Sequence, residues 1–283
     1  MTISSPTGST RVVGVIGDPV RHSLSPVLHN AAFVALGMDW TYVAFHVATG
    51  LGGQAVEAVR ALSIEGLSVT MPHKSDVAAA VDVLTDDAAA LGAVNTVLRR
   101  NAQLVGDSTD GHGFITALAE AGFDPAGKRC MVVGAGGAGR AVVLALARGG
   151  AERIVVVNRH PGRAAAAAVA LGGGVAVVGG TESAAESDLV VNATPVGMAG
   201  PAMGVSVVDA DLLGPGQFVN DLVYHPAQTP LLLAAAQRGA TVLNGLPMLV
   251  HQAARQFELW TGQPAPLAAM RTAVDHELSS RAD

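Results

Sequence analysis

The sequence is poor in charge, aromatic residues and cysteine, and each shortage narrows what the protein can be. Of its 283 residues, 14% are charged and 4% are aromatic, and the formal net charge is −6. Because a nucleic-acid-binding protein needs clustered Lys and Arg to contact phosphates, this balance argues against a nucleic-acid partner. The single cysteine, Cys130, excludes a disulfide framework and a multi-cysteine metal site. We expect a cytoplasmic protein.

Long hydrophobic runs are also missing, although half of the residues are hydrophobic and the mean hydropathy is +0.41. The longest apolar stretch, residues 164–180, contains five glycines and is shorter than the roughly 20 residues that cross a bilayer. The N-terminal residues show no basic start followed by an apolar region, which argues against a signal peptide. We therefore expect no membrane partner and attribute the hydrophobicity to buried parallel strands and alanine-rich helices.

What is present is a regular alternation of Val/Ile-rich runs with helical stretches. This alternation predicts an α/β fold with right-handed crossovers and a mainly parallel sheet. The expected strands are residues 12–16, 41–47, 67–70, 131–133, 154–157, 189–192, 218–223 and 241–243. The clearest expected helices are residues 26–36, 139–148, 163–171 and 230–238.

The alternation changes character along the chain, which predicts two domains. Up to residue 109 the polar residues gather in loops, whereas residues 110–245 form regular strand–turn–helix units typical of a nucleotide-binding Rossmann domain. Residues 246–283 hold two helical patterns and no strand. Periodicity alone leaves open whether this last segment caps the second domain or returns to the first.

A glycine-rich turn opens the expected nucleotide-binding domain. Gly134, Gly136 and Gly139 match the G-x-G-x-x-G pattern, between a strand at 131–133 and a helix. Such a turn lets the backbone approach a pyrophosphate, with the helix N-terminus facing its charge. Glycine-rich turns also occur for purely structural reasons, but the strand and helix around this one favour dinucleotide binding.

The next strand indicates which dinucleotide binds. An NAD site usually carries an Asp or Glu about 20 residues after the glycines, to bind the ribose 2′-hydroxyl. This chain instead has Asn158 and Arg159, followed by Arg163, and two guanidinium groups can pair with a 2′-phosphate. The pattern favours NADP, although two solvated arginines at a helix start are the alternative.

Lysine is the rarest of the charged residues, with only Lys74 and Lys128 among 17 basic residues. Lys128 follows Gly127 in a short loop and is expected to be a solvated charge. Lys74 follows a strand and Pro72, which suits the first turn of a helix, so the amine would lie at a positively polarised end. A lysine there is a candidate for proton transfer. Asp110 is a candidate helix N-cap, or a carboxylate that holds the amine of Lys74.

At this point the ordered motifs resemble the shikimate dehydrogenase family, whose members reduce 3-dehydroshikimate with NADPH in aromatic amino-acid biosynthesis. The resemblance covers nearly the whole chain. The matching segments are residues 17–26, 68–74, 92–96, 106–111, 134–139, 158–159, 192–198, 221–224 and 245–252.

The resemblance implies a role for each matching residue. It makes Lys74 and Asp110 the catalytic pair, and it also places Asp110 against the substrate. The substrate carboxylate would be bound by Ser23 and Ser25 with Tyr224 nearby. Ring hydroxyls would be bound, or the catalytic pair supported, by Thr70, Asn95 and Gln252. The cofactor would be held by Gly134, Gly136, Gly137, Ala138, Gly139, Asn158, Arg159, Arg163, Thr194, Val223, Gly245 and Met248.

The family also implies an architecture: a substrate-binding domain formed by residues 1–109 and 246–283, and an NADP-binding Rossmann domain formed by residues 110–245. The last helices would return to the N-terminal domain. We expect a small-molecule substrate, no metal site, and a monomer or a homodimer, since family members occur as both.

Three positions depart from the common pattern. Ser68 and Ser108 stand where family members often carry Asn, and His160 stands where Thr is common. The first two put a turn or a substrate contact in doubt, and the third removes a possible contact to the 2′-phosphate, which leaves dual use of NAD open. The alternatives are a quinate or aminoshikimate dehydrogenase of the same family and a non-catalytic NADP-binding regulatory module.

Overall fold

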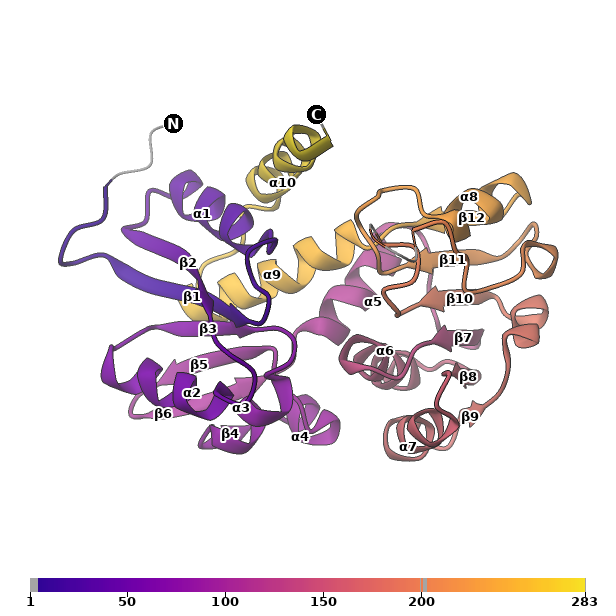
Figure 1. Ribbon diagram of the computed structural model, residues 1–283, viewed down its shortest axis with the longest axis horizontal. Helices are drawn as coiled ribbons and strands as arrows, with labels where there is room; N and C mark the ends of the chain where they lie inside the picture. The colour runs from indigo at the N-terminus through magenta and orange to yellow at the C-terminus, as the bar shows by residue number, and fades with distance from the viewer. Residues whose placement is uncertain (1–4, 199, 201–202, 283) are drawn as a thin grey trace. The chain divides into compact units, whose positions relative to one another are not determined.

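The computed structural model describes residues 5–198, 200 and 203–282, which divide into two compact units. The first unit comprises Met1–Thr109 and Val250–Asp283, and the second comprises Asp110–Leu249. Each unit contains one six-stranded sheet (Figure 1). The prediction assigned residues 246–249 to the first domain, whereas the contacts group them with the second unit. No helix in the described part of the chain is long and apolar enough to cross a membrane.

The first unit builds a mixed sheet flanked by helices. Its strands are β1 (Arg11–Gly17), β2 (Trp40–His46), β3 (Gly66–Val69), β4 (Val83–Leu84), β5 (Thr96–Arg100) and β6 (Gln103–Asp107). Its helices are α1 (Ser25–Ala35), α2 (Gly52–Ala61), α3 (Lys74–Ala80), α4 (Asp86–Leu91), most of α9 (Leu246–Thr261) and α10 (Leu267–Ala282).

The strand order of this sheet is β2-β1-β3-β5-β6-β4. β1 pairs in parallel with β2 and β3, whereas β5 runs antiparallel to both β3 and β6. The β5–β6 hairpin was absent from the predicted strands. Its connection is only two residues long, and Asn101 adopts a positive φ of 55°, a conformation that asparagine tolerates better than most residues.

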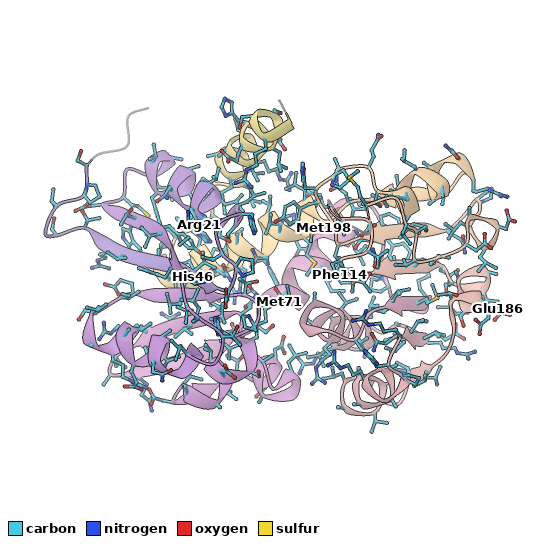
Figure 2. The ribbon with its side chains drawn as sticks, in the orientation of Figure 1. Arg21, His46, Met71, Phe114, Glu186 and Met198 are labelled. Carbon is cyan, nitrogen blue, oxygen red and sulfur yellow. The ribbon has the colours of Figure 1, made fainter. Side chains whose placement is uncertain are left out.

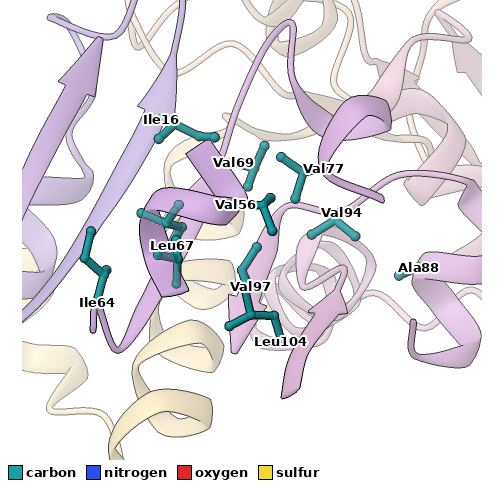
Figure 3. Close-up of a cluster of buried hydrophobic side chains, with 11 residues drawn as sticks. Ile16, Val56, Ile64, Leu67, Val69, Val77, Ala88, Val94, Val97 and Leu104 are labelled. Atoms are coloured by element: carbon teal, nitrogen blue, oxygen red, sulfur yellow. The ribbon is translucent and has the colours of Figure 1, made fainter. Parts of the chain in front are cut away.

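The two faces of the first sheet differ in chemistry because side chains alternate along each strand. Leu67, Val69 and Val97 point to the face covered by α2 and α3, where they form an aliphatic core (Figure 3). Between them, Ser68 and Thr96 point to the opposite face and reach a side chain of α9. One face is therefore aliphatic, and the other, here called the polar face, carries hydrogen-bonded polar groups among apolar residues such as Val15.

The C-terminal helices belong with the first unit from Val250 onward, which answers the question that periodicity left open. α10 packs against α1. A guanidinium nitrogen of Arg281 donates to the backbone carbonyl of His22 over 3.2 Å, and Arg271 lies 3.3 Å from a ring nitrogen of His251.

The second unit is a parallel α/β sheet. Its strands are β7 (Arg129–Val133), β8 (Arg153–Val157), β9 (Ala176–Val178), β10 (Leu189–Asn192), β11 (Phe218–Asp221) and β12 (Thr241–Leu243). Its helices are α5 (Asp110–Glu120), α6 (Gly137–Arg148), α7 (Pro161–Leu171) and α8 (Pro230–Gln237), with short 3₁₀ turns η1 (Thr181–Glu186) and η2 (Ala210–Leu212).

The strand order β9-β8-β7-β10-β11-β12 is that of a Rossmann fold, and all five strand pairs are parallel. Side chains such as Met131, Val190 and Val219 are fully buried in its core. The order reverses between β7 and β10. In open parallel sheets, ligands bind beyond the carboxyl ends of the strands at this reversal.

Candidate active site

In the first unit, the predicted substrate residues gather at one edge of the sheet. Thr70 directly follows β3, and Asn95 directly precedes β5. Because β3 and β5 are antiparallel, the end of one strand meets the beginning of the other. The Thr70 backbone N–H also donates to the Ile16 carbonyl over 3.0 Å, which joins the end of β1 to the same edge. Met71, the exposed residue after Thr70, marks this edge in Figure 2.

Ser23 and Ser25 lie where the loop after β1 enters α1. Ser25 is the first residue of α1, and its backbone N–H donates to the Ser23 hydroxyl over 3.2 Å. Ser25 is buried and Ser23 is half-buried. Two hydroxyls at a helix N-terminus can donate to a carboxylate, whose charge the helix dipole also favours.

Lys74 is the first residue of α3, a short helix of seven residues. The prediction that Pro72 lies in the first helical turn is wrong: Pro72 sits in the turn before α3, and His73 is the residue that precedes the helix. Lys74 itself is nevertheless at the positively polarised end, as expected. Its carbonyl accepts a 2.9 Å hydrogen bond from the Val94 N–H, which fastens the lysine segment beside Asn95.

The Asn95 side chain is held by several hydrogen bonds. Its Oδ1 accepts from the Thr96 hydroxyl (2.7 Å) and from the Thr109 backbone N–H (2.8 Å), and its Nδ2 lies 3.0 Å from the Thr109 hydroxyl. Asn95 and Thr109 are both buried. The amide is therefore oriented by its neighbours.

Asp110 immediately follows Thr109 and is the first residue of α5 rather than the capping residue before it. It belongs to the second unit, while Lys74 belongs to the first. The pairing of these two side chains remains a prediction from the sequence.

Gln252 lies on α9, as does a second glutamine that the sequence reasoning missed. Gln256 is one helical turn further along, and its side chain contacts Ser68, Thr96 and the backbone of Asn95. The signals that could have found it are the four-residue spacing from Gln252 and the polar Ser68 within an otherwise apolar strand.

In the second unit, the three glycines of the turn are used in three different ways. Gly134 has φ +110°, and a Cβ there would lie 2.8 Å from the Ala193 carbonyl oxygen. A Cβ on Gly139 would press into the Gly134 carbonyl, so the helix packs directly on the turn. A Cβ on Gly136 would meet no atom within 4 Å. α6 begins at Gly137 and includes Ala138, two residues earlier than predicted.

This turn fits a bound dinucleotide. The open space at Gly136 lies at the N-terminus of α6 and at the reversal between β7 and β10, where a pyrophosphate can approach backbone N–H groups. Asn158, at the end of β8, lies close to the turn, since its Oδ1 is 3.4 Å from the Ala135 nitrogen. Its Nδ2 donates to the His160 carbonyl over 3.0 Å, which shapes the loop that carries Arg159.

Arg159 and Arg163 are exposed, as a site for a 2′-phosphate requires. His160 lies between them, just before α7, and makes no side-chain cap to that helix. Within the described ranges, no ion pair joins Arg159 or Arg163 to a carboxylate. The described residues also contain no group of three His, Cys, Asp or Glu side chains placed to hold a metal ion.

A second polar network fastens the carboxyl ends of β10 and β11. Asn192 Oδ1 accepts from the Thr194 hydroxyl (2.7 Å), and its Nδ2 donates to Asp221 (2.9 Å). Asp221 also accepts from the Val223 N–H (3.0 Å) and from the Thr229 hydroxyl (2.6 Å). Burial raises the pKa of Asp221, and these hydrogen bonds oppose the rise. Sequence reasoning assigned no role to Asp221 or Thr229.

The remaining predicted residues follow this network along the chain. Gly245 packs backbone against backbone, since a Cβ there would run into the Leu222 carbonyl. Tyr224 and Met248 also belong to the second unit, with Met248 in the first turn of α9. Met198, an exposed residue of the loop after β10, is labelled in Figure 2.

A Rossmann sheet with a glycine turn at its reversal, joined to a second α/β unit that carries a lysine at a helix start, defines a nicotinamide-dependent oxidoreductase. Family models then specify the kind. Residues 15–97 match the shikimate dehydrogenase substrate binding domain, residues 117–197 match shikimate/quinate 5-dehydrogenase, and residues 245–274 match the shikimate 5′-dehydrogenase C-terminal domain. The chain belongs to the shikimate dehydrogenase family.

Curated relatives and solved structures agree with this assignment. The chain is 46% identical over 271 residues to a shikimate dehydrogenase (NADP(+)) from Moorella thermoacetica, a match covering 93% of this chain and 92% of the relative. A shikimate dehydrogenase solved in complex with NADP+ superposes with a TM-score of 0.92 at 36% identity, covering 97% and 98% of the two chains. The Thermus thermophilus enzyme, solved with NADP(H) and shikimate, gives 0.87 at 38% identity, covering 94% and 99%.

Proposed function

We propose that this protein is an NADP-dependent shikimate dehydrogenase that catalyses the reversible reduction of 3-dehydroshikimate to shikimate in aromatic amino-acid biosynthesis. The observation that carries the proposal is the grouping of predicted site residues where β3 ends and β5 begins in the first sheet. There, the Val94–Lys74 backbone hydrogen bond of 2.9 Å sets the lysine segment beside the buried Asn95, with Thr70 at the neighbouring strand end.

The substrate residues suit a polyhydroxylated ring that bears a carboxylate. Ser23 and Ser25 donate to the carboxylate at the start of α1, while Thr70, Asn95 and Gln252 contact ring hydroxyls or support the catalytic pair. A site that pairs each hydroxyl with a fixed neutral partner rejects analogues that lack one, because its own polar groups would then be left unpaired. Tyr224 lies near the carboxylate.

When bound, the nicotinamide cofactor would supply or accept the hydride exchanged with C3 of the ring. Lys74 donates the proton to the C3 oxygen during reduction and accepts it during oxidation, and Asp110 orients the amine. The glycine turn from Gly134 to Gly139 binds the pyrophosphate. Arg159 and Arg163 pair with the 2′-phosphate, and Asn158 shapes their loop. Thr194, Val223, Gly245 and Met248 complete the cofactor site.

We further propose that the enzyme works in the cytoplasm, as a monomer or a homodimer, on a small-molecule substrate. The single cysteine, Cys130, leaves the chain without an internal disulfide, and disulfides are rare in the cytosol.

The test is a panel of substrates and cofactors on the purified protein, followed by absorbance of the reduced nicotinamide. We expect shikimate to reduce NADP with a higher kcat/KM than it reduces NAD, and quinate to be a poor substrate. A preference for quinate would overturn the assigned substrate. Binding of NADP without turnover of any of these compounds would favour a regulatory module.

A further inference from the structure

A chain of buried polar side chains crosses the polar face of the first sheet. The Tyr42 hydroxyl donates to Ser68 Oγ over 2.7 Å, and Ser68 donates to Gln256 Oε1 over 2.7 Å. Gln256 Nε2 then donates to the Thr96 hydroxyl over 2.9 Å. All four residues are buried. Ser68 and Thr96 are direct cross-strand partners on β3 and β5, and Gln256 bridges them from α9.

Each hydrogen bond in this network has a fixed donor and a fixed acceptor. Gln256 Nε2 lies 3.3 Å from the Asn95 backbone carbonyl as well as near Thr96. A backbone carbonyl only accepts, so the amide of Gln256 cannot turn over without setting two oxygens against each other. Because Thr96 accepts from Gln256, its single hydroxyl proton is directed to Asn95 Oδ1, 2.7 Å away.

A second backbone group fixes the orientation of Asn95, at the end of this hydrogen-bonded network. The Thr109 N–H, which only donates, lies 2.8 Å from Asn95 Oδ1. Turning the Asn95 amide over would set its NH₂ group against this N–H and against the Thr96 hydroxyl. An unmade hydrogen bond in a buried site is costly, so the amide keeps one orientation, with Oδ1 toward Thr96 and Nδ2 toward the Thr109 side chain.

Tyr42, the first donor of the network, is equally constrained. Tyr42 is 2% exposed, and His29 stacks on its ring with centroids 4.4 Å apart and planes 5° from parallel. Burial raises the pKa of Tyr42, so its hydroxyl keeps its proton and remains a donor to Ser68. This arrangement explains why a serine fits at position 68. Its short side chain leaves room for the Tyr42 oxygen on one side and the Gln256 amide on the other.

We propose that Gln256, with Tyr42, Ser68 and Thr96, forms a positioning network that holds the Asn95 amide in the orientation that reads a ring hydroxyl of the substrate. The inference rests on the proposed function, which places Asn95 against the ring. None of the four residues is a catalytic residue. Thr96, Gln256 and Ser68 act through Asn95, and Tyr42, which also hydrogen-bonds Ser25, is the most distant member. The network therefore sets KM and the discrimination among ring hydroxyls.

The test compares isosteric variants along the chain. Thr96→Val removes the hydroxyl that ends at Asn95 Oδ1, and Thr96→Ser restores it. We expect Thr96→Val to raise the KM for shikimate about tenfold, with the KM for NADP unchanged, and Thr96→Ser to recover the wild-type value. Gln256→Met, Ser68→Ala and Tyr42→Phe should have progressively smaller effects as the change moves away from Asn95.

A specificity measurement separates positioning from folding. The discrimination between shikimate and analogues lacking the 4- or the 5-hydroxyl should shrink for one of the two analogues in Thr96→Val and Gln256→Met. Urea unfolding of each variant reports stability independently, and Tyr42→Phe and Ser68→Ala provide further tests if Thr96→Val fails to fold. An unchanged KM and unchanged discrimination in folded variants would overturn the inference alone. Failure of the wild type to oxidise shikimate would overturn the proposed function as well.

Discussion

In each unit a buried asparagine beside the proposed site, Asn95 in the first and Asn192 in the second, connects strand ends, but the two networks are built differently. Asn192 uses partners that follow closely in sequence, the hydroxyl and the N–H of Thr194, together with the carboxylate of the adjacent strand. Asn95 uses Thr96 and Thr109, and it is supported by Gln256, 161 residues away. One network stays between β10 and the start of α8 and includes a carboxylate, whereas the other is neutral and reaches a residue of α9 that is 161 positions away.

The difference follows from the part of the proposed site that each network supports: a loop beside the glycine turn in the second unit, and a substrate-facing amide in the first. Beside the glycine turn, the loop after β10 packs closely on Gly134, where a Cβ would lie 2.8 Å from the Ala193 carbonyl oxygen. Hydrogen bonds from Thr194 to the buried Asn192 Oδ1 hold this loop. At the edge of the first sheet, a donor amide must point one way among neutral hydroxyls, and a directed network of hydroxyls and amides achieves that without a charged group in the network.

The largest effect is expected in the first unit, at Lys74. Lys74→Ala should lower kcat by about 10²–10⁴-fold, because it removes the group that transfers the proton. Lys128→Ala, in the loop before β7, is the matched control and should behave as the wild type. Steady-state rates of shikimate oxidation measure both. Similar rates for the two variants would remove Lys74 from the mechanism.

A pair of glycine variants tests how the second unit approaches the cofactor. Gly139→Ala should destabilise the protein and weaken NADP binding, because its Cβ would collide with the Gly134 carbonyl. Gly136→Ala should fold normally, since its Cβ would meet no atom within 4 Å, yet lose NADP affinity because that space is for the pyrophosphate. Thermal unfolding and calorimetric titration with NADP separate the two. Normal NADP binding by Gly136→Ala would contradict the assigned site.

The arginines of the second unit should set the cofactor preference. Arg159→Gln is expected to raise the KM for NADP about 10- to 100-fold, the worth of a charge-assisted contact to phosphate, and to leave the KM for NAD unchanged. Arg153→Gln, at the other end of β8, is the control. Kinetics with the two cofactors measure the effect, and an equal change in both would show that Arg159 does not contact the 2′-phosphate.

His29 offers a smaller, pH-dependent test of the first unit. Burial lowers its pKa from 6.5 to about 3, and the neighbouring Gln256 side chain opposes this shift only in part. The unfolded chain therefore takes up a proton near pH 6.5 that the folded chain refuses, so stability falls as the pH drops below 6.5. This group should cost the wild type about 2 kcal/mol at pH 5.

His29→Phe should remove that acid sensitivity while keeping a ring against Tyr42. Urea unfolding at pH 7.5 and pH 5 measures the difference, with the exposed His276→Phe as the control. An acid loss in His29→Phe as large as in the wild type would show that another group is responsible.

Local patterns predicted most of the second unit. β10 and β12 have the predicted bounds, and the glycine turn lies where its spacing placed it, whereas the short edge strand β9 was not predicted. These features depend on neighbours within a few residues, so the sequence displays them directly. The same holds for Lys74 at a helix start, although Pro72 lies outside the helix.

The first unit was harder to predict because its decisive contacts are remote. The β5–β6 hairpin, which turns at Asn101, makes β5 antiparallel to its neighbours, and no α/β alternation signals it. Ser68 and Gln256 are 188 residues apart, and nothing in the sequence around either residue indicates that the two form a hydrogen bond. The departure at Ser68 was visible in the sequence, but its meaning required the positions of Tyr42 and Gln256.

The central claim is that residues of the first unit determine the affinity for the substrate, and residues of the second unit determine the affinity for the cofactor. The most direct measurement is the KM for shikimate and the KM for NADP in Asn95→Ala and Arg159→Gln, determined side by side. We predict that Asn95→Ala raises only the KM for shikimate and that Arg159→Gln raises only the KM for NADP. If either variant raised both values to the same extent, the division of labour between the two units would be contradicted.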